Sequence, residues 1–206
     1  MSRKYLAEAL RSIAQNDYMI DGNYLQGGET LNRAADCLDS EARHAAQDAQ
    51  LQAIGRGAFE SIAEMVAALE CDYDRLEELR ELGENMPAED WASDEYTDER
   101  EELRELTEAS GERNSREDAE QRISEDPLSI ELSGKWTVGS PPVAGRAYIL
   151  LSTGGPATRI VCELDDGEPH RAWIQAQDWG TPWTDFNGGD SEILLTYCRQ
   201  FYFGEG

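Results

Sequence analysis

The chain has 206 residues and a formal net charge of −25, with 43 acidic against 18 basic residues and four cysteines. Its length suits one large or two small domains with a hydrophobic core. The negative charge excludes direct nucleic-acid binding over most of the surface, and no stretch approaches the roughly 18 continuous apolar residues of a membrane span. Residues 1–16 are charged and amphipathic, unlike a secretory signal. The cysteines are scattered without a CxxC spacing, which indicates free thiols and a cytoplasmic protein.

The first 127 residues are predicted to be helical. Near the N-terminus, apolar side chains recur at helical spacing, at Tyr5, Leu6, Leu10 and Ile13. Glycines within residues 21–28 then mark a loop.

Two longer helical patterns follow. Small and apolar residues occupy heptad positions over residues 31–49, and we expect Gly55 and Gly57 to end that helix. A similar pattern covers residues 62–76, with Pro87 as its end. We interpret the two helices as an antiparallel hairpin, in one chain or in a homodimer through residues 28–84. An ordinary bundle core is the alternative.

Local signals set the limits of two further helices. The first is predicted to begin at Thr97 and to run through Ser110, with Gly111 as its C-terminal stop. The second is short: Ser115 precedes it as an N-cap and Pro127 closes it.

After Leu128 the hydrophobic period changes from helical to strand-like. Four strands are predicted, separated by Gly-rich turns, at residues 129–133, 147–152, 159–164 and 171–176. Residues 191–203 are predicted to form a helix capped by Ser191. The fold class is therefore α+β: an N-terminal helical hairpin or bundle with an acidic helical middle within residues 60–126, then a small antiparallel-sheet domain closed by a C-terminal helix. The domains expected are 1–127 and 128–206.

Most of the excess charge lies in the middle of the chain, where residues 60–131 carry 26 acidic residues against 7 arginines. A helical wheel gathers these carboxylates into stripes opposite the apolar side of each helix. The first stripe holds Glu70, Asp74, Glu77, Glu78 and Glu81. The second holds Glu95, Asp98, Glu101, Glu102, Glu105 and Glu108.

The second stripe has a charge density close to that of DNA. Residues 95–108 carry a net charge of −5, or one charge per roughly 4 Å of helix, against one phosphate per about 3.4 Å of a B-DNA strand. Two such stripes side by side would present a phosphate-like surface to a basic groove. The alternative is a solvated face that only confers solubility. Against it, like charges recur at i, i+4, and residues 1–59 are nearly neutral, unlike a uniformly acidic halophilic protein.

Residues for catalysis or metal binding do not cluster in the sequence. The two histidines, His44 and His170, fall in different predicted domains. Residues 152–156 suit a hairpin turn better than an anion-binding nest, because strands flank them on both sides. Neither a cofactor nor a metal is expected, and no enzymatic activity is predicted.

Two tryptophans in a Gly/Pro loop, Trp179 and Trp183, form a secondary candidate contact site. They are predicted to pack over the sheet. Their alternative role is a partner-binding hot spot, since such sites are rich in tryptophan.

Three strings carry a resemblance: residues 152–161 (STGGPATRIV), 178–184 (DWGTPWT) and 201–205 (FYFGE). Over about residues 120–206 the chain resembles uncharacterised acidic proteins of bacteriophages and conjugative elements. The resemblance implies a mobile-element origin and brings no assigned activity. The charge pattern resembles that of DNA mimics, namely antirestriction and anti-CRISPR proteins. We therefore expect an inhibitor that occupies the basic nucleic-acid-binding groove of a host defence complex. The alternative is a non-catalytic helical scaffold, and an enzyme or ligand-binding module in the C-terminal domain comes last.

Overall fold

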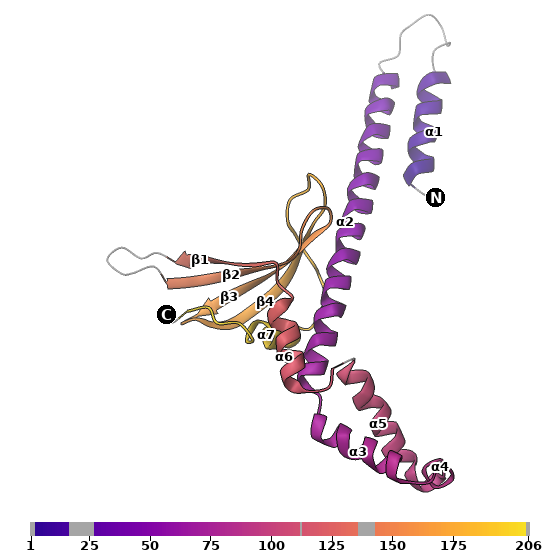
Figure 1. Cartoon of the computed structure of the whole chain (residues 1–206). Helices are drawn as coiled ribbons and strands as arrows, with labels where there is room; N and C mark the ends of the chain where they lie inside the picture. Colours follow the sequence, from indigo (N-terminus) through magenta and orange to yellow (C-terminus); the bar gives the residue numbers. More distant parts are fainter. Residues whose placement is uncertain (1–2, 17–26, 112, 136–142, 205–206) are drawn as a thin grey trace, which may run out of the picture. The chain divides into compact units, whose positions relative to one another are not determined.

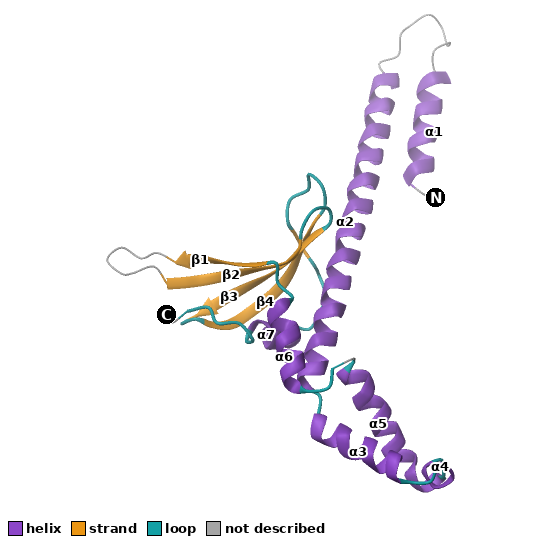
Figure 2. Ribbon diagram, in the orientation of Figure 1, coloured by secondary structure: helices purple, strands orange, loops and turns teal. Residues whose placement is uncertain are grey.

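The structure is a computed structural model, which describes residues 3–16, 27–111, 113–135 and 143–204. It is α+β, as predicted, with helices first, then an antiparallel sheet, then a closing helix (Figures 1 and 2). The chain divides into two compact units, Met1–Leu51 and Gln52–Gly206. Each unit is described separately below.

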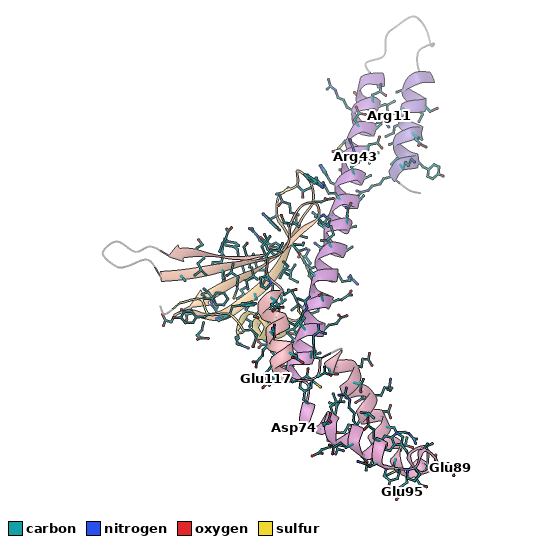
Figure 3. All side chains as sticks on the ribbon, in the orientation of Figure 1. Arg11, Arg43, Asp74, Glu89, Glu95 and Glu117 are labelled. Carbon is teal, nitrogen blue, oxygen red and sulfur yellow. The ribbon has the colours of Figure 1, made fainter. Side chains whose placement is uncertain are left out.

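The first unit contains a helical hairpin made by α1 (Arg3–Asn16) and the first part of α2 (Gly27–Glu70). Arg11 lies between the two helices (Figure 3) and donates hydrogen bonds to Asp36 at 2.7 Å and Asp39 at 2.6 Å. Three alanines are buried along the pair, namely Ala7, Ala14 and Ala35. An N-terminal helical hairpin is therefore present, and the helix that pairs with the first part of α2 is α1.

The predicted hairpin between residues 31–49 and 62–76 of one chain is wrong, because α2 continues through Gly55 and Gly57. The helix predicted over residues 62–76 is instead divided between α2, which ends at Glu70, and α3 (Tyr73–Asn85). Gly55 serves close packing instead of helix termination. A Cβ atom placed on it would lie 2.6 Å from the Cβ atom of Phe186. Residues 185–187, on either side of Phe186, also bind α2 through hydrogen bonds. The Gln52 side chain donates to the Asp185 carbonyl at 2.9 Å and accepts from the Asn187 amide at 2.8 Å.

The two glycines offer a matched test of this explanation. Gly55→Ala is expected to lower the free energy of unfolding by about 1–3 kcal/mol, because the added methyl group overpacks against Phe186. Gly57→Ala is expected to raise it by about 0.5–1 kcal/mol, since no atom lies within 4 Å of the new Cβ and alanine favours the helix. Urea denaturation measures both effects. Shifts in the same direction would contradict the packing role of Gly55.

The second unit holds a five-stranded antiparallel sheet in the order β1-β2-β3-β4-β5. The strands are β1 (Ser129–Lys135), β2 (Val143–Ser152), β3 (Ala157–Asp165), β4 (Glu168–Gln177) and β5 (Thr184–Asp185). The first four confirm the predicted strands, with each extended by a few residues. The closing helix α7 (Ser191–Cys198) is shorter than predicted, and its cap is Asp190, whose carboxylate accepts from the Glu192 amide at 2.9 Å.

The core of this unit lies between one face of the sheet and three helices. The face consists of alternate strand residues, including Ile149 on β2, Ile160 on β3 and Ile174 on β4. Its cover comes from α2, α6 (Arg116–Glu125) and α7, through the buried side chains Ile62, Met65, Val66, Leu69, Ala119, Ile123, Leu194, Leu195 and Tyr197. Figures 1 and 2 show α6 and α7 beside the sheet.

The compact units of the structure divide the chain at a different place from the predicted domains. We predicted domains 1–127 and 128–206, whereas the compact units divide at Leu51 and Gln52. The reason is that α2 and α6 bury their apolar sides on the sheet, so the sheet and its closing helix do not form a core by themselves. A hydrogen bond also joins α7 to the end of α6: the Tyr197 hydroxyl donates to the Asp126 carboxylate at 2.7 Å.

Candidate partner-binding surfaces

Residues 72–111 form an acidic hairpin that carries most of the predicted contact residues. It consists of α3 (Tyr73–Asn85), the short turns α4 (Ala88–Trp91) and η1 (Asp94–Tyr96), and α5 (Thr97–Ser110). The Asp72 carboxylate caps α3 by accepting from the Arg75 amide at 3.0 Å. Gly111, at φ +59°, ends α5 as predicted.

Apolar side chains and one aromatic pair hold the hairpin closed. Leu76 and Leu79 are buried on α3, and Leu103 and Leu106 are half-buried on α5. At the far end, the Trp91 and Tyr96 rings lie 5.9 Å apart. The Arg100 side chain closes this end by donating to the main-chain carbonyls of Trp91 and Ser93.

One charged contact crosses the hairpin. The Arg75 guanidinium donates to both carboxylate oxygens of Glu102, at 3.0 and 2.8 Å, and to Glu78 at 3.2 Å. These hydrogen bonds lower the pKa of Glu102 below its usual value. Their contribution to stability is therefore present at neutral pH and is lost as the pH falls through the lowered pKa. Glu102 therefore joins α3 to α5, and its predicted contact with a partner stays a prediction.

Few carboxylates of the hairpin are neutralised within it. Residues 72–111 carry sixteen acidic and four basic residues, a net charge of −12. Besides the Arg75 contacts, Arg80 lies 3.9 Å from Glu77 and Arg104 lies 3.5 Å from Glu101. The other twelve acidic residues have no ion pair among the described residues. From the predicted stripes these are Asp74, Glu81, Glu95, Asp98, Glu105 and Glu108; Glu70, at the end of α2, is also exposed without an ion pair within the described part of the chain.

The two acidic stripes lie on opposite sides of the hairpin. The leucines form the seam between the helices, and at 100° per residue the carboxylates Asp74 and Glu81 fall on the far side of α3 from that seam. Glu105 and Glu108 fall on the far side of α5 in the same way. Figure 3 labels Asp74 near one end of the hairpin, and Glu89 and Glu95 at its α4 end. The hairpin is therefore acidic on both outer sides, and the stripes are not side by side.

The tryptophan loop divides into one packed and one exposed residue. Trp183 lies over the guanidinium of Arg159, whose carbon is 4.2 Å from the ring centre. Trp179 lies against Gly155, where a Cβ atom would be 1.9 Å from its ring nitrogen, yet it stays 79% exposed. Thr181 orders the turn, because its hydroxyl accepts from the Asp178 amide and its amide donates to the Asp178 carbonyl. Trp179 thus remains a candidate contact residue, whereas Trp183 packs as predicted.

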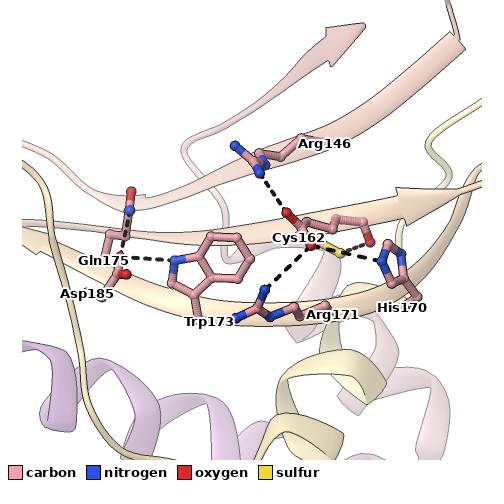
Figure 4. A network of polar contacts seen from close by, with 8 residues as sticks. Arg146, Cys162, His170, Arg171, Trp173, Gln175 and Asp185 are labelled. Carbon is pink, nitrogen blue, oxygen red and sulfur yellow. Dashed lines mark hydrogen bonds and ion pairs between the residues drawn. The ribbon is translucent and has the colours of Figure 1, made fainter. Parts of the chain in front are cut away.

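The outer face of the sheet carries a polar and aromatic network that the sequence analysis did not single out (Figure 4). Arg146 donates to Glu163 at 2.6 Å, and the guanidinium carbons of Arg146 and Arg171 lie 5.7 and 5.2 Å from the centre of the Trp173 ring. The Trp173 ring nitrogen donates to Asp185 at 3.1 Å. Alternation along the strands is the signal that places these residues on one face. Because they satisfy one another, we interpret the network as structural.

The remaining chemistry of the described residues is limited. No group of three or more histidine, cysteine or acidic side chains suited to a metal ion occurs among them. His44 and His170 are exposed, and His170 lies 4.0 Å from Glu163. The four cysteines are unpaired, with Cys162 and Cys198 buried in the core. In the part of the chain that the structure describes, every helix is too short or too polar to cross a membrane.

Comparisons with known protein families, with curated protein sequences and with solved structures found no match to this chain.

Proposed function

We propose that the protein is a non-enzymatic inhibitor from a mobile element, which acts in the cytoplasm of a bacterial host. Its acidic hairpin would occupy the basic nucleic-acid-binding groove of a defence nucleoprotein, such as a CRISPR effector or a restriction enzyme. The observation that carries the proposal is the set of twelve carboxylates on residues 72–111 without an ion pair among the described residues.

The placement of these carboxylates suits insertion between two basic walls. Because the stripes of α3 and α5 face in opposite directions, the hairpin presents negative charge on both outer sides. A nucleic-acid groove offers positive side chains from both walls and contacts a duplex or strand on more than one side. Carboxylates in such a groove replace the phosphates as partners of Arg and Lys.

The cost of this charge supports a functional role. Like charges at i, i+4, such as Glu77 with Glu81 and Glu101 with Glu105, each destabilise a helix by a few tenths of a kcal/mol. A helix face that needs only solubility is usually laced with both signs. The hairpin contains no lysine, and its arginines point to partners inside the hairpin.

Competition tests the proposal. The tagged protein is used to capture complexes from a bacterial host with active defence systems, and each captured complex is then purified and assayed alone. We expect a nucleic-acid-binding complex whose binding to the protein falls as salt rises and is displaced by double-stranded DNA. Capture of partners that ignore both salt and DNA would favour the alternative, a scaffold whose charge only confers solubility.

A further inference from the structure

The first unit has a very small core for its size. Its α1–α2 hairpin buries Ala7, Ala14 and Ala35, with Leu10 and Leu31 half-buried, and three larger apolar side chains of α1 stay exposed. Tyr5 is 68% exposed, Leu6 43% and Ile13 52%. Two helices that bury little more than methyl groups are marginal in water, because helical stability comes mainly from packing of an apolar face. Within the described residues of the first unit, these side chains of the hairpin therefore have no apolar cover.

Two of these exposed side chains, Leu6 and Ile13, lie along one edge of the hairpin. On α1, at 100° per residue, Arg11 lies on one side of the line through Ala7 and Ala14, and Leu6 and Ile13 lie on the other. Arg11 closes its edge by pairing with α2.

The surface of α2 that faces α1 likewise has a charged side and an apolar side. Asp36 and Asp39, the partners of Arg11, lie to one side of the buried Ala35, and the half-buried Leu38 and exposed Ala45 lie to the other. Because the two helices are antiparallel, the apolar side of α1 (Leu6, Ile13) and that of α2 (Leu38, Ala45) lie at the same edge of the hairpin. The first edge of the hairpin is thus ion-paired through Arg11. The second edge is mainly apolar and exposed, and one exposed ion pair, between Arg3 and Glu41 at 3.3 Å, also lies on it.

The charge distribution indicates what covers the open edge. Residues 1–51 carry a net charge of −3, against −22 for residues 52–206, so two copies of the chain repel each other least at the first unit. Within this unit α1 carries +2 and residues 27–51 carry −3. The α1 helix of one copy beside the α2 helix of another is therefore electrostatically favourable.

We propose that a second copy of the chain packs on this edge, so that two α1–α2 hairpins form a four-helix bundle around Leu6, Ile13 and Leu38. Such a contact is self-complementary about a two-fold axis, the commonest arrangement of homodimers. This dimer surface uses α1 and the first part of α2, and is smaller than the surface over residues 28–84 that the sequence predicted. The later part of α2 already packs on the sheet through Ile62 and Leu69.

Mass in solution tests the dimer. At about 20 μM the full-length chain is expected at twice its 23.0 kDa mass by light scattering. The double variant Leu6→Glu/Ile13→Glu is expected at the monomer mass, with the dimer weakened at least about 100-fold, because it buries unpaired charges. Arg56→Glu is the matched control: it also changes the net charge by −2, at an exposed position of α2 outside the first unit, and should leave the dimer intact.

A milder variant separates lost packing from lost folding. Leu6→Ala/Ile13→Ala keeps good helix formers in α1, so helical circular dichroism should match that of the wild type while the dimer weakens at least about tenfold. A wild-type monomer at 20 μM, which would mean that the edge is covered within one chain, overturns the proposal. So does a dimer that both double variants leave intact.

Discussion

Reversing three unpaired carboxylates of α5, in Asp98→Lys/Glu105→Lys/Glu108→Lys, is expected to weaken inhibition of the target at least about tenfold, equivalent to roughly 1.4 kcal/mol. All three side chains are exposed and lack an ion pair among the described residues, so they are available to a cationic groove. The seam leucines Leu103 and Leu106 are untouched, and we expect the fold to survive. Inhibition is measured as the concentration that halves target activity, and folding by circular dichroism.

Glu102 is deliberately kept in this variant. Its reversal would place a lysine against Arg75 and open the hairpin, so a loss of inhibition would have two explanations. The matched control is Glu131→Lys/Asp165→Lys/Glu168→Lys, which makes the same change of +6 at exposed positions of the sheet that have no ion pair among the described residues. That control should inhibit as well as the wild type.

The other stripe has its own variant, Asp74→Lys/Glu77→Lys/Glu81→Lys on α3. If the hairpin inserts between two basic walls, both triple variants lose inhibition. If it lies against a single wall, only one of them does. Should both variants stay folded and inhibit a confirmed target like the wild type, the charge is only solubilising. The loop containing Trp179 and Trp183 then becomes the leading contact surface.

The parts of the fold that follow from local chemistry were predictable from the sequence. The α5 helix has the predicted limits, Thr97 and Ser110, because Gly111 adopts the positive φ that ends helices. Ser115 caps α6 as predicted, with its hydroxyl accepting from the Asp118 amide at 3.2 Å. The strands follow from their alternation and their glycine turns. Each of these signals acts within a few residues of the chain.

The features that were missed depend on contacts between distant residues. Gly55 was predicted to end a helix, but the structure explains the glycine by its close contact with Phe186, more than 100 residues further along the chain. Glu102 looked like a surface acid, but Arg75 on another helix binds it. A helical wheel describes one helix at a time, so it left the opposite orientation of the acidic sides of α3 and α5 undetermined. It also joined Glu70 and Glu95 to these stripes, although Glu70 lies on α2 and Glu95 on η1. Only the pairing of the two helices decides which way each stripe faces.

The predicted domain boundary after residue 127 separates side chains that share one core, and cutting the chain there has the second large expected effect. A fragment of residues 128–206 is expected not to fold, although it contains every strand, α7 and four of the five tryptophans. It lacks five large buried side chains that α2 and α6 supply, namely Ile62, Met65, Val66, Leu69 and Ile123. At about 2 kcal/mol each, these contribute on the order of 10 kcal/mol, as much as the whole stability of a typical domain.

The control fragment is residues 48–206, which keeps the second unit and one helical turn before Gln52. It is expected to fold, since its core and the Gln52 contacts to Asp185 and Asn187 are intact. Near-ultraviolet circular dichroism reports on the shared tryptophans in both fragments, so the comparison measures packing and not composition. Fixed tryptophan signals in the 128–206 fragment, with a cooperative urea transition, would restore the boundary at Pro127. Their loss in 128–206 and presence in 48–206 would show that α2 and α6 belong to the core of the sheet.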